Sequence, residues 1–182
     1  MGGVEIDKYS FLTSYLMVVD ADFKIIDDLY LYLKPDDGIY KVCASSMEVN
    51  QIDLIEHDKK AITYKEAGTK LYLWLKKHTN DGQLKLMPIG HGVGGDIMWI
   101  VEHLISRGSW EKFISHRRVD TLSACQFLKT CNCFPETVSG SLESLSEHFK
   151  LTDKVCGSLH DAKVDTWLNY YVFLELRKII VK

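Results

Sequence analysis

A histidine and an aspartate stand five positions apart near the C-terminus, in the segment His160-Asp161-Ala162-Lys163-Val164-Asp165. The pattern predicts that His160 precedes a helix and that Asp165 lies in its second turn, on the apolar face. A buried carboxylate is costly unless it is paired, hydrogen-bonded or bound to a metal ion. A neutral histidine nearby could take a proton from an attacking water. Asp165 is therefore the most informative single residue of the chain.

A second segment contains residue types that could bind a ligand or take part in catalysis. It is Gly90-His91-Gly92-Val93-Gly94-Gly95-Asp96, between a predicted short strand and an amphipathic helix. A glycine-rich strand-to-helix junction could hold a phosphate at the helix N-terminus. It does not match a Walker loop, because no Lys-Ser/Thr pair follows. Asp96 has two interpretations: a carboxylate that complements the helix dipole, or, together with Asp165, a ligand of a hard cation such as Mg²⁺.

The elements that must position these residues begin with a β-hairpin over residues 11–19 and 24–33. Further helices are expected over residues 63–78, 97–105, 141–149 and 161–181, and short strands over 84–89 and 118–121. The pair Arg107-Gly108 is expected to end the helix before it. A hairpin followed by alternating elements predicts an α/β fold, in which helices flank a mixed sheet.

Bulk composition limits the function classes. A chain of 182 residues fits a single domain, residues 1–182, and its net charge of −3 argues against gripping long duplexes by phosphate neutralisation alone. No apolar run approaches the roughly 20 residues that cross a bilayer, so no membrane partner is expected. The cysteines are odd in number, which suggests reduced thiols in a soluble, intracellular protein. They are Cys43, Cys125, Cys131, Cys133 and Cys156, and their spacing matches no standard zinc site.

Both segments resemble motifs of the DEDDh 3′–5′ exonuclease family, which includes oligoribonuclease, ribonuclease T and the polymerase proofreading subunits. The segment ending at Asp165 is similar to the third motif, and the segment ending at Asp96 to the second, usually Gly-His-Asn followed by variable residues, Phe and Asp. The resemblance implies a ribonuclease-H-like fold, Mg²⁺ or Mn²⁺ as cofactor and the single-stranded 3′ end of a nucleic acid as partner. The site residues that it implies are the catalytic His160, Asp96 and Asp165, of which the two aspartates bind metal, and the substrate-side His91 and Gly92.

The sequence also departs from the family pattern. The family's first motif, Asp-x-Glu-Thr, lies on the first strand, whereas here Met1 stands where the Thr would be and Gly2-Gly3 follow. The central first strand and two of the four acidic ligands are therefore expected to be missing. In the second motif, Gly92 replaces the usual Asn and Gly95 the usual Phe.

Glu5 and Asp7 are possible substitutes for the missing acidic pair, because they have the right types with one residue between them. They come so soon before the hairpin that little chain is left for a reversed central strand. Catalytic geometry tolerates only small misplacements, so this substitution is the less favoured interpretation.

Three hypotheses follow. The favoured one is a degenerate exonuclease-like protein that binds nucleic acid or a protein partner. The second is an active metal-dependent 3′–5′ exonuclease, and the third is a shortened form of such an enzyme. Without a central strand, we expect a collapsed sheet, or exposed edges that recruit a second copy or a partner protein.

Overall fold

The computed structural model describes residues 1–157 and 159–181. The chain divides into two compact units: unit 1 comprises Met1–Leu86 and Gly95–His116, and unit 2 comprises Met87–Gly94 and Arg117–Lys182. The single domain expected over residues 1–182 stays a prediction.

Unit 1 is built on the predicted hairpin. Strand β1 (Thr13–Val19) pairs antiparallel with β2 (Ile25–Lys34), and the short β3 (Ile62–Thr63) pairs in parallel with the end of β2. The Asp20 carboxylate closes the hairpin turn by accepting the backbone N–H groups of residues 22 and 24. The result is a small mixed sheet with the strand order β1-β2-β3, which confirms the coarse α/β class.

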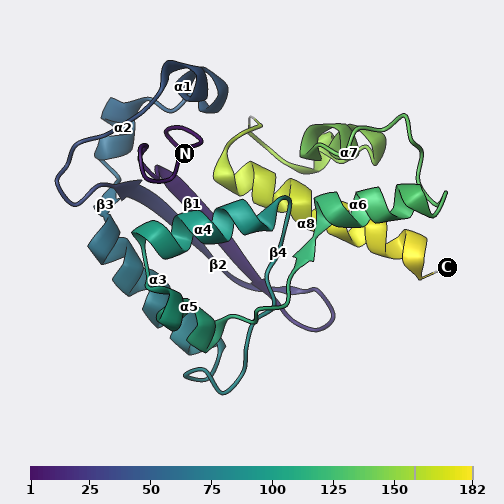
Figure 1. The fold of residues 1–182 in the computed structure, drawn as a ribbon, viewed down its shortest axis with the longest axis horizontal. Coiled ribbons are helices and arrows are strands. Elements are labelled where there is room, and N and C mark those ends of the chain that lie inside the picture. Colours follow the sequence, from purple (N-terminus) through teal and green to yellow (C-terminus); the bar gives the residue numbers. More distant parts are fainter. Residues whose placement is uncertain (158, 182) are drawn as a thin grey trace. The chain divides into compact units, whose positions relative to one another are not determined.

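One face of this sheet is covered by α3 (Tyr64–His78), which packs against β2 (Figure 1). The predicted capping box is present: the Thr63 hydroxyl accepts the N–H of Glu66, and the Glu66 carboxylate accepts the N–H of Thr63. Unit 1 also holds most of α4 (Val93–His103) and all of α5 (Arg107–Phe113). Its core contains Leu31, Leu33, Leu71, Leu75, Trp99 and Phe113.

Two predictions about local structure were wrong or incomplete. Arg107-Gly108 begins α5 instead of ending a helix, because the Ser106 hydroxyl accepts the N–H of Ser109 and caps a new helix. The expected strand over residues 84–89 shrinks to β4 (Ile89–Gly90), and Pro88 just before it has no N–H to donate to a neighbouring strand.

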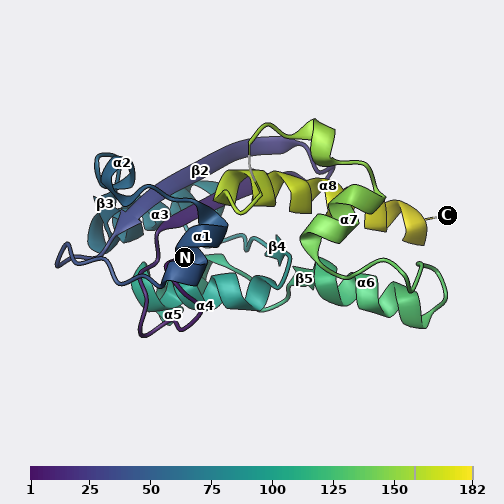
Figure 2. The ribbon, with the colours of Figure 1, turned by 90° about the horizontal axis from the view of Figure 1, so that it is seen from above.

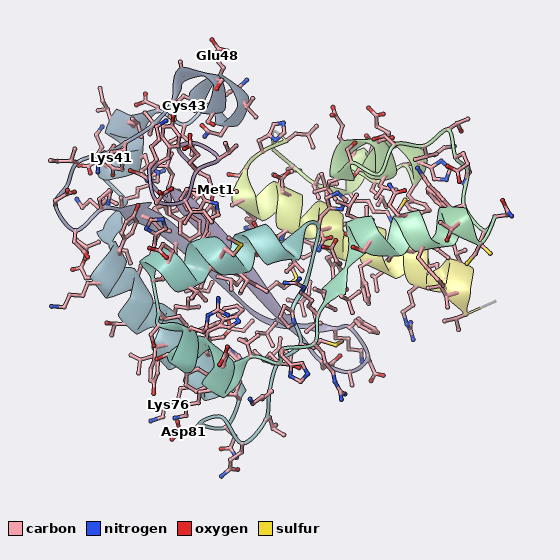
Figure 3. All side chains as sticks on the ribbon, in the orientation of Figure 1. Met1, Lys41, Cys43, Glu48, Lys76 and Asp81 are labelled. Atoms are coloured by element: carbon pink, nitrogen blue, oxygen red, sulfur yellow. The ribbon has the colours of Figure 1, made fainter. Side chains whose placement is uncertain are left out.

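Two short helices of unit 1 were missed. They are α1 (Ala44–Asn50), which buries no residue, and α2 (Leu54–Asp58), which buries only His57. Neither helix has the apolar periodicity from which a helix is predicted. The side chains of Lys41, Cys43 and Glu48 mark this corner of unit 1, near Met1 (Figure 3). There the N–H of Cys43 donates to the carbonyl of Gly2 over 2.7 Å, which ties the start of α1 to the N-terminal segment.

Unit 2 contains a two-stranded parallel sheet and a group of helices. β4 pairs with β5 (Val119–Asp120), and β5 leads directly into α6 (Thr121–Thr130). The long helix α8 (Ala162–Ile180) packs against both α6 and α7 (Leu142–His148), with the 3₁₀ turn η1 (Thr152–Lys154) before it (Figure 2). In the described part of the chain, no helix combines the length and apolar character that a membrane crossing requires.

Candidate functional site

The start of α8 holds the first candidate pair. Asp161 caps the helix, because its carboxylate accepts the N–H groups of Lys163 and Val164. His160 precedes the cap with a positive φ of 71°, and its backbone N–H donates to Oδ1 of Asp165 over 3.1 Å. Asp165 falls in the first turn of α8, not in the second as expected. Unit 2 thus brings His160 and Asp165 together.

The carboxyl group of Asp165 is partly removed from water. Burial raises its pKa, while the hydrogen bond from the His160 N–H and the His160 side chain oppose that rise. The exposed imidazole of His160 lies at the helix start, where solvent can reach it. Because burial disfavours the charged form of this carboxylate, a nearby cation or a bound proton would stabilise it. A pKa perturbed in this way is typical of functional sites.

The second candidate region lies where β4 and β5 end. Because the strands are parallel neighbours, Gly90 and Asp120 lie side by side at the same end of the sheet. One carboxylate oxygen of Asp120 accepts three backbone N–H groups: those of Leu122 over 3.0 Å and Ser123 over 3.4 Å, which caps α6, and that of Gly92 over 3.1 Å. Gly92 has a φ of +68°, which an Asn tolerates less readily than a glycine. The loop after β4 is therefore anchored by its backbone.

A buried polar network supports His91. Its Nδ1 lies 3.0 Å from the hydroxyl oxygen of Thr121, which is fully buried. That hydroxyl donates to Oδ1 of Asn169 over 2.8 Å, and the carbonyl oxygen of Gly90 is 3.3 Å away. Burial lowers the pKa of His91, although Asp120 and the Gly140 backbone act in the opposite direction. The imidazole is therefore neutral near pH 7.

Sequence reasoning missed Asn169. A signal was present, because a polar residue stands four positions after Asp165, on the same face of a helix that is otherwise apolar there. The network that Asn169 joins links β4, α6 and α8 within unit 2. It fixes the ring of His91 relative to the loop that follows β4.

A positively charged side chain, that of Arg118, lies beside the same loop. The guanidinium of Arg118 approaches Gly94 so closely that a Cβ on Gly94 would meet Nη1 at 3.2 Å. Arg118 is itself exposed, just before β5. The first backbone N–H groups of α4 have no acceptor within the helix. Glycine-rich backbone and a guanidinium together form a surface suited to an anion.

The remaining predicted residues belong to unit 1. Asp96 is an exposed residue in the first turn of α4. Burial lowers the pKa of the Met1 amino group, and the charge of Asp96 partly opposes this, so the two groups are neighbours. Glu5 and Asp7 are exposed and lie outside any strand: Glu5 precedes a turn and Asp7 lies within it, and Glu5 pairs with Lys8 over 3.2 Å.

Among residues 1–157 and 159–181, no group of three or more His, Cys, Asp or Glu side chains could hold a metal ion. The Mg²⁺ or Mn²⁺ cofactor that the resemblance implies therefore stays a prediction, and we derive no step through such an ion. All five cysteines are free thiols.

No protein-family model matches the chain, and no curated protein matches it either. The resemblance to the DEDDh exonucleases therefore stays a prediction, which rests on the two motifs and on the order of the elements.

Proposed function

We propose that this chain is a DEDDh exonuclease-like protein of ribonuclease-H-like fold, which binds the 3′ end of a single-stranded nucleic acid without hydrolysing it. The observation that carries the proposal is the partly buried carboxylate of Asp165, held by the N–H of His160 at the start of a long helix. The hairpin, the strand-to-helix junctions β4–α4 and β5–α6, and the final helix α8 follow in the order that the resemblance implies.

Binding is supported by the anion-attracting surface at the end of β4. Phosphate oxygens are held by arginine side chains, by backbone N–H groups and by helix N-termini. Arg118 packs on Gly94, and the loop from Gly90 to Gly94 is kept in place through Gly92 and Asp120. A single strand could place its terminal phosphodiester there although the chain has a net charge of −3.

Loss of hydrolysis is supported by two glycines. Gly92 offers no polar side chain where the family usually has Asn. Gly95 stands where the family usually has Phe, and a Cβ built on it would meet no atom within 4 Å, so no packed pocket surrounds that position. Loss of a substrate-side amide and of a packing aromatic is consistent with binding that no longer leads to cleavage.

The second candidate is an active metal-dependent 3′–5′ exonuclease. It is favoured by the raised pKa of Asp165, because a carboxylate whose burial disfavours its charge is stabilised by a bound cation.

The edge strand β1, which pairs only with β2 among the described strands, supports a further proposal, in which a second copy or a partner protein adds a strand there.

Equilibrium binding tests the proposed function. A labelled single-stranded oligonucleotide is titrated with chain 1–182, and its fluorescence anisotropy is compared for Arg118→Ala and for Arg107→Ala. Arg107 is a matched control, because it is an exposed arginine of unit 1 that pairs with Glu111 over 3.7 Å. We expect R118A to weaken binding and to lower the salt slope by roughly 0.7, the loss of one phosphate contact on a single strand. Absent binding, or equal loss in both variants, would overturn the proposal.

A further inference from the structure

The C-terminal end of α6 is a turn bracketed by two cysteines. The N–H of Cys133 donates to the carbonyl of Leu128 over 2.9 Å, and the N–H of Asn132 donates to that of Lys129 over 2.8 Å. Asn132 has a φ of +55°. These are the two hydrogen bonds and the left-handed residue of a Schellman motif. Cys131 and Cys133 therefore lie on either side of one residue whose conformation is fixed.

Both thiols are accessible and lie close to each other along the chain. Cys131 and Cys133 are exposed, and neither is bonded to another sulfur. Sγ of Cys133 lies 3.4 Å from the carbonyl oxygen of Cys131, so this thiol folds back over the peptide of the first cysteine. Phe134, the next residue, is buried against His148 and Phe149, which anchors the far side of the turn.

The spacing suits a disulfide within the turn. Two consecutive Cα–Cα steps of about 3.8 Å reach at most about 7.6 Å, and a left-handed central residue shortens that span. Disulfides join Cα atoms roughly 4.4–6.8 Å apart. Both side chains are exposed, and Cys131 is the C-cap of α6, so the disulfide would lie outside the body of that helix.

We propose that Cys131 and Cys133 form a dithiol redox couple, which is oxidised by exchange with a small disulfide such as glutathione disulfide. The thiolate of one cysteine attacks a glutathione sulfur, which breaks that S–S bond and releases one glutathione thiolate. The thiolate of the other cysteine attacks the protein sulfur of the mixed disulfide and releases the second. The protein loses two electrons and two protons, and glutathione disulfide becomes two thiols.

The other cysteines lack a neighbour of this kind. Cys43 precedes α1 with no second cysteine within two positions of it in the sequence, and Cys125 is buried in the core of unit 2. Cys156 is exposed, and no second cysteine stands within two positions of it in the sequence. Cys156 is therefore the internal control: its reaction with glutathione disulfide should stop at the mixed disulfide.

The test is incubation of the full chain with glutathione disulfide, followed by acid quench, alkylation and peptide mass spectrometry. We expect the peptide with Cys131 and Cys133 to lose two hydrogen atoms and carry no glutathione, while Cys156 keeps one. In Cys131→Ser or Cys133→Ser, the remaining cysteine should keep a stable glutathione adduct, and Cys156→Ser should behave like the wild type at the turn. Unmodified thiols, or lasting adducts at both cysteines of the wild type, would overturn the proposal. Circular dichroism of each variant checks that it is folded.

Discussion

The backbone N–H of His160 donates a hydrogen bond to the carboxylate of Asp165, with 3.1 Å between nitrogen and oxygen. This bond links the residue before the cap of α8 to the first turn of that helix, and His160 has a positive φ of 71°. The chain therefore holds a non-glycine residue in an uncommon conformation at the place where both motif residues meet. Such local strain is typical of functional positions.

Replacing Asp165 by Asn should remove a pH-dependent cost of folding. Burial raises the pKa of this carboxyl, so the folded chain binds more protons than the unfolded chain between the ordinary aspartate pKa of about 4 and the raised value. The stability contributed by this group therefore falls as pH rises through that window. Thermal melts should show D165N equal to the wild type below pH 4 and more stable at pH 7. A wild-type advantage at pH 7 would contradict this.

Replacing Thr121 by Val should destabilise unit 2. The valine has nearly the same shape but lacks the hydroxyl that donates to Asn169 and lies beside His91. Polar groups left unsatisfied in a buried site cost about 1–3 kcal/mol. Urea unfolding measures this loss, with Thr130→Val as the control in the same helix. Thr130 is exposed, so its replacement should change stability by less than about 0.5 kcal/mol. Equal effects of the two variants would show that the network contributes nothing.

Replacing Gly68 by Ala should destabilise unit 1. A Cβ on Gly68 would lie 2.0 Å from the carbonyl oxygen of Leu104, and this close approach is to backbone that cannot rotate away. Overpacking of this kind costs about 1–3 kcal/mol and occasionally more. Gly108→Ala in α5 is the matched control, because a Cβ there meets no atom within 4 Å. It should stabilise by about 0.5–1 kcal/mol through helix propensity, and a neutral G68A would contradict the packing.

Replacing Asp27 by Asn should remove an acid-sensitive contribution to stability. Oδ2 of Asp27 accepts from Lys77 and from His78, both over 2.8 Å, and these bonds hold the pKa of Asp27 well below its ordinary value. A lowered carboxyl pKa stabilises the fold above pH 4 and loses that effect as the pH falls. The wild-type advantage over D27N should therefore shrink in acid. An advantage that does not change with pH would contradict the pairing.

Local signals in the sequence were enough for several elements. The apolar and β-branched runs on both sides of Asp20 predicted the hairpin, because alternation and turn residues act over short distances. Thr63 and Glu66 predicted the start of α3 through their capping box. The placement of Asp165 next to His160 also follows from local helix geometry.

Other features depend on contacts between residues that are far apart in the sequence, which no local pattern predicts. Thr121 and Asn169 are 48 positions apart, so only the packing of α8 against α6 brings them together. Arg107-Gly108 begins α5 where a helix end was predicted, because the Ser106 side chain caps a new helix there. The approach of Arg118 to Gly94 arises from the pairing of β4 with β5, which no local pattern specifies.

The most direct test of the central claim is to follow one 5′-labelled single-stranded oligonucleotide with purified chain 1–182 in Mg²⁺ or Mn²⁺, measuring both mobility shift and length. We predict that the oligonucleotide is bound and stays at full length, and that blocking its 3′ hydroxyl weakens binding. Shortening that disappears in His160→Ala and Asp165→Ala, but persists in Asp153→Ala, would contradict the account and establish an active exonuclease.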